Sequence, residues 1–269
     1  MFSETKRWMR NMIYAWTAAV VVFIYIPIVV IIMASFVKSR FFRLPVKAWE
    51  TKWYEEALTA NLMHQLHLTS FFIASSVAIL SVFLGFFGAL AFARYDWKGR
   101  HLFQKLLMVP IFFPQAVLGL ALLLWFSFLG IIPTWHTAII AHLVWIAPIV
   151  TLVISIQVYG YDTAQEEAAF DLGANRFQVL REVTLPALAP GLFSGALFAF
   201  LLSWVNFSLS TYTTGADNTV TEWLYAKMIV GYTPLVPALG ALSVYGSIVI
   251  LVVGYLVYRA RVRAKAAAL

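Results

Sequence analysis

The sequence predicts an all-α integral membrane protein with six transmembrane helices. Of its 269 residues, 62% are hydrophobic and only 12% are charged, about half the charged share of an ordinary soluble domain. The apolar residues form long runs without charge, each near the ~20 residues that a helix needs to cross a bilayer. A soluble enzyme, a disordered chain and a disulfide-stabilised secreted module are therefore excluded.

The predicted spans lie at 14–37, 68–93, 106–129, 137–159, 187–209 and 238–258. The first follows a short basic tail but is too long for the apolar part of a cleaved signal peptide, so we expect it to remain as a span. Pro110 and Pro114 should kink the start of the third span. We expect the whole chain, 1–269, to form a single transmembrane domain.

The distribution of Lys and Arg predicts the orientation. With the N-terminus in the cytoplasm, thirteen of the 19 Lys and Arg residues lie on the cytoplasmic side, as the positive-inside rule requires. Six spans then place both termini in the cytoplasm. The net charge of the chain is +7. In this arrangement most of the excess positive charge lies on the cytoplasmic side, where it faces anionic lipid, so we expect membrane lipid, and no nucleic acid, as the partner of these charges.

The predicted spans contain no charged side chain away from their ends, whereas ion-coupled transporters bind the coupling ion with buried ionisable groups. His142 is the one titratable group deep in a span, and packing is a better expectation for it than proton relay. The sequence has no cysteine, no H-E-x-x-H motif and no phosphate-binding G-x-x-x-x-G-K-[ST] loop. We expect no catalytic, cofactor-binding or metal-binding residues, and if the chain moves a solute, a partner must supply the energy.

Small residues recur at every fourth position in two spans: Ser81, Gly85, Ala89 and Ala93 in the second, Gly191 and Gly195 in the fifth. Small side chains let membrane helices approach closely. Packing within one bundle is the expected use of these stripes, and a contact between subunits is the alternative.

The loop at 160–186 mixes acids and bases after a long run without charge. Thr163 and Glu166 have the spacing of a capping box, which predicts a helix start. Gly173 predicts the end of that short helix. A second short helix should cover 174–182, with Pro186 opening the fifth span. An amphipathic hairpin resting on lipid headgroups would have similar features.

The same loop carries a longer pattern: Glu167-Ala168-Ala169, three residues, Gly173, nine residues, then Val183-Thr184-Leu185-Pro186. It resembles the E-A-A-x3-G-x9-I-x-L-P loop of membrane permease subunits from binding-protein-dependent ABC importers, with Val in place of Ile. The resemblance implies the type I ABC importer transmembrane domain as the fold, with this loop as the coupling helix that sits in a cleft of a cytoplasmic ATPase.

The resemblance also implies roles for the coupling residues Glu167, Ala168, Ala169, Gly173, Leu185 and Pro186. Glu167 would make the polar contact with the ATPase, the two alanines would allow close approach, Gly173 would turn the chain, and the last two would fix the start of the fifth span. The partners implied are a cytoplasmic ATPase dimer that binds ATP and Mg, a second homologous permease and an extracytoplasmic solute-binding protein. The chain itself would be no enzyme, and would lie in a bacterial inner membrane.

Weaker motifs resemble one branch, the second permease of spermidine/putrescine importers: Tyr25-Ile-Pro-Ile-Val-Val, Ser35-Phe36, Thr51-Lys-Trp-Tyr54, Thr214-Gly215 and Val230-Gly231. Such permeases carry acidic residues shortly after the position of Ser203, but this sequence reads Ser203-Trp-Val-Asn-Phe207. A polyamine is therefore one expected solute, while opines and aminoalkylphosphonates, which related branches move, stay open. A secondary transporter or channel working alone is the alternative from another class.

Ser203, Asn206 and Ser210 would lie on one face of a continuous fifth helix. Polar groups avoid lipid, so this face should line either a solute pathway or a contact between helices. Trp204 and Phe207 beside them would act as gate elements or as packing.

In the first outer loop, aromatic residues alternate with acids: Trp49, Glu50, Trp53, Tyr54, Glu55 and Glu56. Anchoring at the membrane interface and contact with an external binding protein both fit this pattern.

Overall fold

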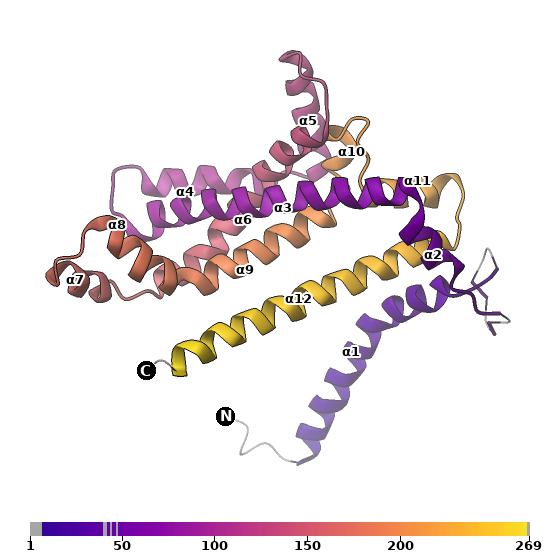
Figure 1. The fold of residues 1–269 in the computed structure, drawn as a ribbon, viewed down its shortest axis with the longest axis horizontal. Helices are drawn as coiled ribbons and strands as arrows, with labels where there is room; N and C mark the ends of the chain where they lie inside the picture. The colour runs from indigo at the N-terminus through magenta and orange to yellow at the C-terminus, as the bar shows by residue number, and fades with distance from the viewer. Residues whose placement is uncertain (1–6, 40–41, 44, 47, 268–269) are drawn as a thin grey trace. The chain divides into compact units, whose positions relative to one another are not determined.

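A computed structural model describes residues 7–39, 42–43, 45–46 and 48–267. Lys6, Arg40 and Lys47, which contribute to the charge balance, lie outside the described residues. The described chain consists of helices and loops with one isolated bridge between Val37 and Trp49 (Figure 1). It forms two compact units: unit 1 comprises Met1–Met63 with Leu224–Leu269, and unit 2 comprises His64–Trp223. The single domain expected over 1–269 stays a prediction.

Unit 1 is built on two long apolar helices, α1 (Arg7–Ser35) and α12 (Leu235–Ala267), which pack against each other. The short helix α2 (Lys52–Thr59) packs on α12. The chain passes between the two units twice, in the first turn of α3 (Asn61–Ala89) and within α11 (Val220–Val230).

The aromatic residues of the first loop hold α2 to the end of α1. Trp53 donates from Nε1 to the carbonyl oxygen of Val37 at 3.1 Å, and the hydroxyls of Tyr54 and Ser35 are hydrogen-bonded at 2.5 Å. Trp49, by contrast, is 59% exposed. Two of the three aromatic residues therefore hold the loop to α1, and the roles predicted for this loop at the membrane interface or with a binding protein stay predictions.

The core of unit 2 is a layer of three long helices. They are α3 (Asn61–Ala89), which continues through the π-helix η1 (Leu90–Arg94), α6 (Trp135–Tyr159) and α9 (Leu185–Trp204). A Cβ atom placed on Gly85 of α3 or on Gly195 of α9 would lie 3.1 Å from Cγ1 of Val150 in α6. The small residues thus bring two helices onto the same residue of α6, so the predicted packing within one bundle is confirmed.

The third predicted span is broken. Helix α4 (Arg100–Met108) leads through the 3₁₀ helix η2 (Val109–Phe112) to α5 (Gln115–Phe128), and the two parts meet at 101°. Pro110 lies in η2 and Pro114 precedes α5, so each proline removes a helical N–H at the bend. The predicted kink is confirmed, and it divides the span predicted over 106–129 into two helices.

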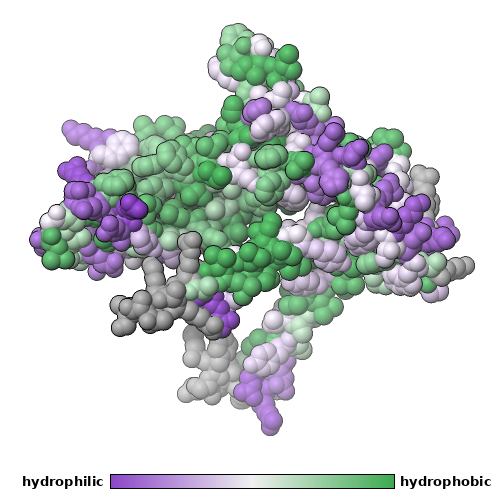
Figure 2. All heavy atoms as spheres, viewed as in Figure 1, coloured by the Kyte–Doolittle hydropathy of each residue, from purple (hydrophilic) through white to green (hydrophobic). Residues whose placement is uncertain are grey.

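Among the described residues, five helices are long and apolar enough to cross a membrane, and the bent pair can make a sixth. Figure 2 shows hydrophobic residues over the middle of unit 2 and hydrophilic residues gathered at the end formed by α7 (Ala164–Asp171) and α8 (Arg176–Val179). Large apolar side chains on α3 face outward, including Ile79 at 70% and Phe83 at 60% exposure. A lipid environment accounts for such surfaces.

The segment after α9 folds back against the other helices of unit 2. It contains α10 (Ser210–Thr213) and is held by Thr137, which donates to the carbonyl oxygen of Thr213 at 2.6 Å. The backbone N–H of Trp135 donates to the Asp217 carboxylate at 3.1 Å. These bonds fix the segment to the N-terminal end of α6.

Candidate functional site

The loop between α6 and α9 begins with α7, whose first turn differs from the prediction. The Asp162 carboxylate accepts a hydrogen bond from the Ala164 N–H at 3.0 Å, whereas Thr163 makes no capping bond with its side chain. The expected capping box of Thr163 and Glu166 is therefore wrong. The physical reason is that the Glu166 carboxylate binds a cation on another helix.

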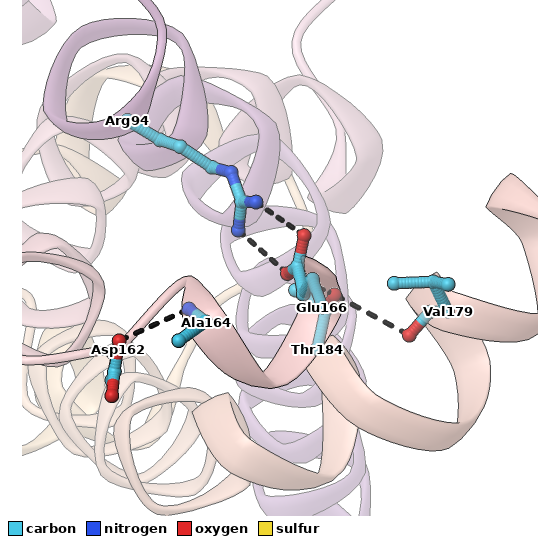
Figure 3. Close-up of polar contacts among 6 residues, drawn as sticks. All are labelled: Arg94, Asp162, Ala164, Glu166, Val179 and Thr184. Atoms are coloured by element: carbon cyan, nitrogen blue, oxygen red, sulfur yellow. Dashed lines mark hydrogen bonds and ion pairs between the residues drawn. The ribbon is translucent and has the colours of Figure 1, made fainter. Parts of the chain in front are cut away.

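Glu166 is buried at the centre of a three-residue contact that we call the Glu166 joint (Figure 3). Arg94 donates to both carboxylate oxygens, from Nη1 to Oε1 at 2.6 Å and from Nη2 to Oε2. Thr184 Oγ1 donates to Oε1 at 2.5 Å. Arg94 is the last residue of η1, and Thr184 ends the π-helix η3 (Leu180–Thr184), so one carboxylate connects α7 to the ends of two membrane helices.

The electrostatics of the joint favour the ionised acid. Burial alone would raise the pKa of Glu166, but the hydrogen bonds from Arg94 and Thr184 outweigh burial and lower it. Tyr161 lies beside the pair, with its ring centre 5.8 Å from Arg94 Cζ. Burial and the negative charge of Glu166 raise the pKa of the Tyr161 hydroxyl, which stays protonated and can donate.

Gly173 ends α7 as predicted. Its φ is +87°, which a residue with a side chain rarely adopts. The Gly173 N–H donates to Phe170 O at 2.9 Å, and the Ala174 N–H donates to Ala169 O at 3.0 Å. These two bonds make a Schellman motif, which satisfies the last carbonyl groups of the helix.

The second helix of the loop is continuous with the fifth span, unlike the separate helix expected over 174–182. Helix α8 begins after Asn175, whose Oδ1 accepts from the N–H groups of Phe177 and Gln178 at 3.1 and 3.0 Å. It runs through η3 into α9 without a break. Leu185 and Pro186 lie where η3 passes into α9, and the missing N–H of Pro186 falls at this change of helix type.

The E-A-A face of α7 is turned outward. Glu167 and Ala168 are exposed and Ala169 is half-buried. Two large apolar residues extend this surface, Leu172 at 90% and Phe177 at 68% exposure. An acidic side chain flanked by small and apolar groups suits a protein partner better than water.

The residues at the end of the fifth span cluster around His142. His142 Nδ1 is hydrogen-bonded to Ser203 Oγ at 2.8 Å, and Nε2 to Ser210 Oγ at 3.1 Å. The Ser210 hydroxyl also donates to Asn206 O at 2.8 Å. All four residues are buried within the chain, so these groups serve a contact between helices in this conformation.

The continuous helical face expected for Ser203, Asn206 and Ser210 is wrong, because α9 ends at Trp204 and the chain resumes helical geometry only at α10. The two aromatic candidates are half-buried. Trp204 stacks on Phe200, with ring centres 5.8 Å apart. The roles of Trp204 and Phe207 in a solute pathway stay predictions.

Sequence reasoning missed Arg94 and Thr184 as partners of the loop. Arg94 appears in the sequence as one of several cations near a span end, and its partner is 72 residues away. Thr184 occupies the variable position within the closing motif. Only the helix packing of unit 2 brings these residues to Glu166.

A search for metal-binding groups over the described residues finds no cluster of three His, Asp or Glu side chains. The polar side chains around Glu166 and around His142 are instead hydrogen-bonded to one another. The arrangement holds helices together and leaves an exposed surface on α7 and at the start of α8.

Comparisons with known proteins agree with this geometry. Two curated relatives match most of the chain. The spermidine/putrescine transport system permease protein PotC of Haemophilus influenzae is 29% identical over 256 residues, covering 95% of this chain and 98% of its own. The putrescine transport system permease protein PotI of Escherichia coli K12 is 30% identical over 251 residues, covering 90% and 88%.

Solved structures support the fold. A bacterial ABC transporter involved in the import of the acidic polysaccharide alginate matches with a TM-score of 0.68 at 18% identity, covering 96% of this chain and 98% of its own. The alginate transporter in complex with alginate pentasaccharide-bound periplasmic protein matches with a TM-score of 0.62 at 14% identity, covering 92% and 91%. The predicted fold of a type I ABC importer transmembrane domain is confirmed.

A family model described as the binding-protein-dependent transport system inner membrane component matches residues 81–264. That range contains the whole loop from Gly160 to Pro186 and four of the six predicted spans. The chain therefore belongs to the family of binding-protein-dependent transport system inner membrane components.

Proposed function

We propose that the chain is the permease subunit of an ATP-driven ABC importer and forms the translocation pathway together with a second, homologous permease. The observation that carries this proposal is the loop between α6 and α9. It has the motif of the family, a Schellman turn at Gly173 and an outward-facing acidic and apolar surface. A surface of this kind needs a partner, and the family supplies one.

ATP hydrolysis belongs to that partner in this proposal. The sequence has no phosphate-binding loop, so a cytoplasmic ATPase dimer would bind ATP and Mg. Glu167 and Ala168 would face the ATPase, with Leu172 inserted into its cleft. Closure of the ATPase dimer on nucleotide would then displace α7 and tilt the membrane helices.

The proposed orientation places this loop and both termini in the cytoplasm. The bias of Lys and Arg supports it, as does the need for α7 to meet a cytoplasmic enzyme. The extracytoplasmic side would receive solute from a binding protein, by analogy with the alginate transporter, whose complex contains a pentasaccharide-bound periplasmic protein. The exposed Trp49, in the loop after the first span, belongs to the extracytoplasmic side in this topology.

The solute is proposed to be small and polar, of the polyamine type or a related opine or aminoalkylphosphonate. The names of both curated relatives support a polyamine. Ser203, Asn206 and Ser210 supply polar groups where α9 ends, and they carry no charge. A broken helix within a membrane is a usual place for a solute site, and the hydroxyl and amide groups there can hydrogen-bond to the amines of a polyamine or to the polar groups of the related solutes.

Purification of the tagged chain with an ATPase and a second permease from the same genome tests the assembly. We expect the three to co-purify and solute uptake into proteoliposomes to require ATP. Glu167→Lys together with Leu172→Asp should weaken ATPase binding at least about tenfold, because each 1.4 kcal/mol lost is a factor of ten. The exposed Glu182, changed to Lys, is the control for charge reversal elsewhere on the loop surface. Uptake by the chain alone without nucleotide would instead establish a stand-alone transporter or channel.

Thermal shift of the binding protein identifies the solute class. Putrescine, spermidine, an opine and an aminoalkylphosphonate would each be added to the purified binding protein that stimulates this permease. A ligand present at about 100 times its Kd stabilises a protein by about 2.7 kcal/mol, which is readily measured as a rise in Tm. Stabilisation by an opine or phosphonate, and by neither polyamine, would reject the polyamine assignment and keep the importer.

A further inference from the structure

We propose that Glu166 is a positioning residue that makes α7, η1 and η3 move as one body, so that displacement of the loop reaches α3 and α9 together. The claim that Glu166 transmits movement rests on the proposed function. The claim that the Glu166 joint is rigid concerns this chain alone and can be tested without any partner. Glu166 lies outside the E-A-A motif, and its role differs from the docking role proposed for Glu167.

The first argument is that donor groups from two other helices meet at the Glu166 carboxylate. The Glu166 carboxylate receives three donor groups, two from Arg94 and one from Thr184. These residues are 72 and 18 positions away in the sequence. A bidentate Arg–carboxylate pair fixes orientation as well as distance. Three helices that meet at one carboxylate cannot shift independently while these bonds persist.

The second argument is the local backbone. Arg94 and Thr184 are each the last residue of a π-helix. π-Helical turns are rare, occur mostly as single insertions within α-helices and are frequent at functional sites. Here one such turn lies at each attachment point, where α3 ends and where α9 begins. Each can absorb a change in helix direction without loss of the adjoining α-helix.

The third argument is the surroundings of the pair. The side chains of Glu166 and Arg94 are only 8% and 18% exposed, so water competes weakly with their bonds. The pair borders a cavity of about 380 Å³ that is also lined by Phe170 and Arg176. The Tyr161 hydroxyl is buried and makes no hydrogen bond to any residue that the structure describes. The Glu166–Arg94 bonds are therefore largely shielded from water, which favours a joint that keeps its geometry.

Glu166 and Glu167 thus have different surroundings at neighbouring positions on one short helix. Glu166 is 6% exposed and bonded inward, whereas Glu167 is exposed. An acid facing outward can dock a partner, and an acid facing inward can hold the helix that carries the docking surface. Loss of the first should weaken binding, and loss of the second should leave the partner bound to a loosened loop.

Spin labelling of the isolated chain tests the rigid joint. Because the native sequence has no cysteine, Gln165→Cys on α7 and Leu84→Cys on α3, both exposed positions, give a clean label pair. Pulsed electron–electron double resonance should give one narrow distribution of the distance between the two labels in the parent chain. Glu166→Gln and Arg94→Gln should each at least double its width, and the charge-exchanged pair Arg94→Glu with Glu166→Arg should narrow it again.

Glu182→Gln, an exposed acid in η3, is the matched control and should leave the distribution narrow. Circular dichroism verifies that each variant is folded, and Thr184→Val provides a milder change if removal of a charge prevents folding. We expect Thr184→Val to broaden the distribution less than Glu166→Gln does. A width unchanged in Glu166→Gln, Arg94→Gln and Thr184→Val would overturn the proposal.

Two further label pairs test transmission in the assembled complex with the ATPase and the second permease. A label at Leu84→Cys on α3, and in a separate sample one at Ser194→Cys on α9, is paired with a label on the second permease, and ATP with vanadate should shift each separation in the parent. With Glu166→Gln, the ATPase should stay bound while each shift falls to less than about a third of the parent value. A full shift in this variant would overturn the transmission role. Failure of the ATPase to bind the parent would count against the proposed function. The distance distributions of the isolated chain would still show whether the Glu166 joint is rigid.

Discussion

His142 and Ser203 are hydrogen-bonded across the contact between α6 and α9, with 2.8 Å between Nδ1 and Oγ. The other ring nitrogen is bonded to Ser210 beyond the end of α9. One imidazole therefore ties α6 to both sides of the break in the fifth span. Hydrogen bonds of this kind hold membrane helices together where lipid offers no hydrophobic drive.

We predict that His142→Leu destabilises the isolated chain by about 1 to 2 kcal/mol, because two interhelical hydrogen bonds are lost and the side-chain volume is nearly kept. Unfolding in mixed micelles with increasing SDS, followed by circular dichroism, measures the change. His101→Leu on the exposed face of α4 is the control and should stay within about 0.5 kcal/mol of the parent. Equal stability of both variants would contradict the structural role of His142.

A second prediction concerns the close contact of α9 with α6 at Gly191. A Cβ atom on Gly191 would lie 2.8 Å from Gln157 Cβ, whereas one on Gly246 of α12 would meet nothing within 4 Å. Gly191→Leu should therefore cost about 1 to 3 kcal/mol through overpacking. Gly246→Leu changes the same residue type in a helix and should be neutral or slightly stabilising. The same SDS titration compares them, and equal stability would show that the two helices can separate freely.

The turn at Gly173 gives a third prediction. Nothing within 4 Å blocks a Cβ atom there, so the cost of Gly173→Ala comes only from the left-handed backbone, about 1 to 2 kcal/mol. Amide exchange at 170–175 should speed up about five- to tenfold, since local opening becomes easier. Gly173→Asn should be milder, because Asn tolerates this conformation.

Gly160→Ala is the control within the same loop. Gly160 has φ −86°, and a Cβ atom there would have its nearest neighbour at 3.7 Å. We expect amide exchange around α7 to be unchanged. Faster exchange in Gly160→Ala of similar size would mean that any loss of glycine loosens the loop.

The sequence predicts those parts of the fold that depend on local chemistry. Long apolar runs define the spans, the prolines place the bend before α5, and Gly173 places the end of α7. The end of α9 at Trp204 is not predictable in this way, because Val205, Phe207 and Leu209 continue the apolar pattern. At the break, Asn206 Oδ1 accepts a hydrogen bond from the Leu209 N–H at 2.9 Å, and His142 is hydrogen-bonded to Ser203 and Ser210 on either side.

The candidate site likewise has features that the sequence predicts and features that it does not. The E-A-A motif identifies the loop and its outward face from residues adjacent in sequence. The spacing of Glu166 from Thr163 is correct for a capping box, yet a guanidinium 72 residues away binds Glu166 instead. A charged hydrogen bond is about twice as strong as a neutral one, so the long-range partner prevails over the local one.

The last prediction follows from the pKa of Glu166. The folded-state value lies below the ordinary 4.5 because Arg94 and Thr184 outweigh the effect of burial. The stabilisation that Glu166 contributes is therefore fully present above pH ~4.5 and is lost as the pH falls through the lowered value. Compared with Glu166→Gln, the parent should be more stable at pH 7, by up to about 3 kcal/mol for a buried pair, and this advantage should shrink in acid.

Arg94→Gln should reverse the direction in which the pKa of Glu166 is shifted by folding. Without the guanidinium, burial dominates and favours the protonated form of Glu166, so its folded-state pKa should rise above 4.5. This variant should then gain stability relative to the parent as the pH falls from 7 toward 5, because protonation relieves an unpaired buried charge. Chain stability measured by SDS titration at several pH values tests both statements. Parallel pH profiles for the parent, Glu166→Gln and Arg94→Gln would show that Glu166 is not held by Arg94 in solution.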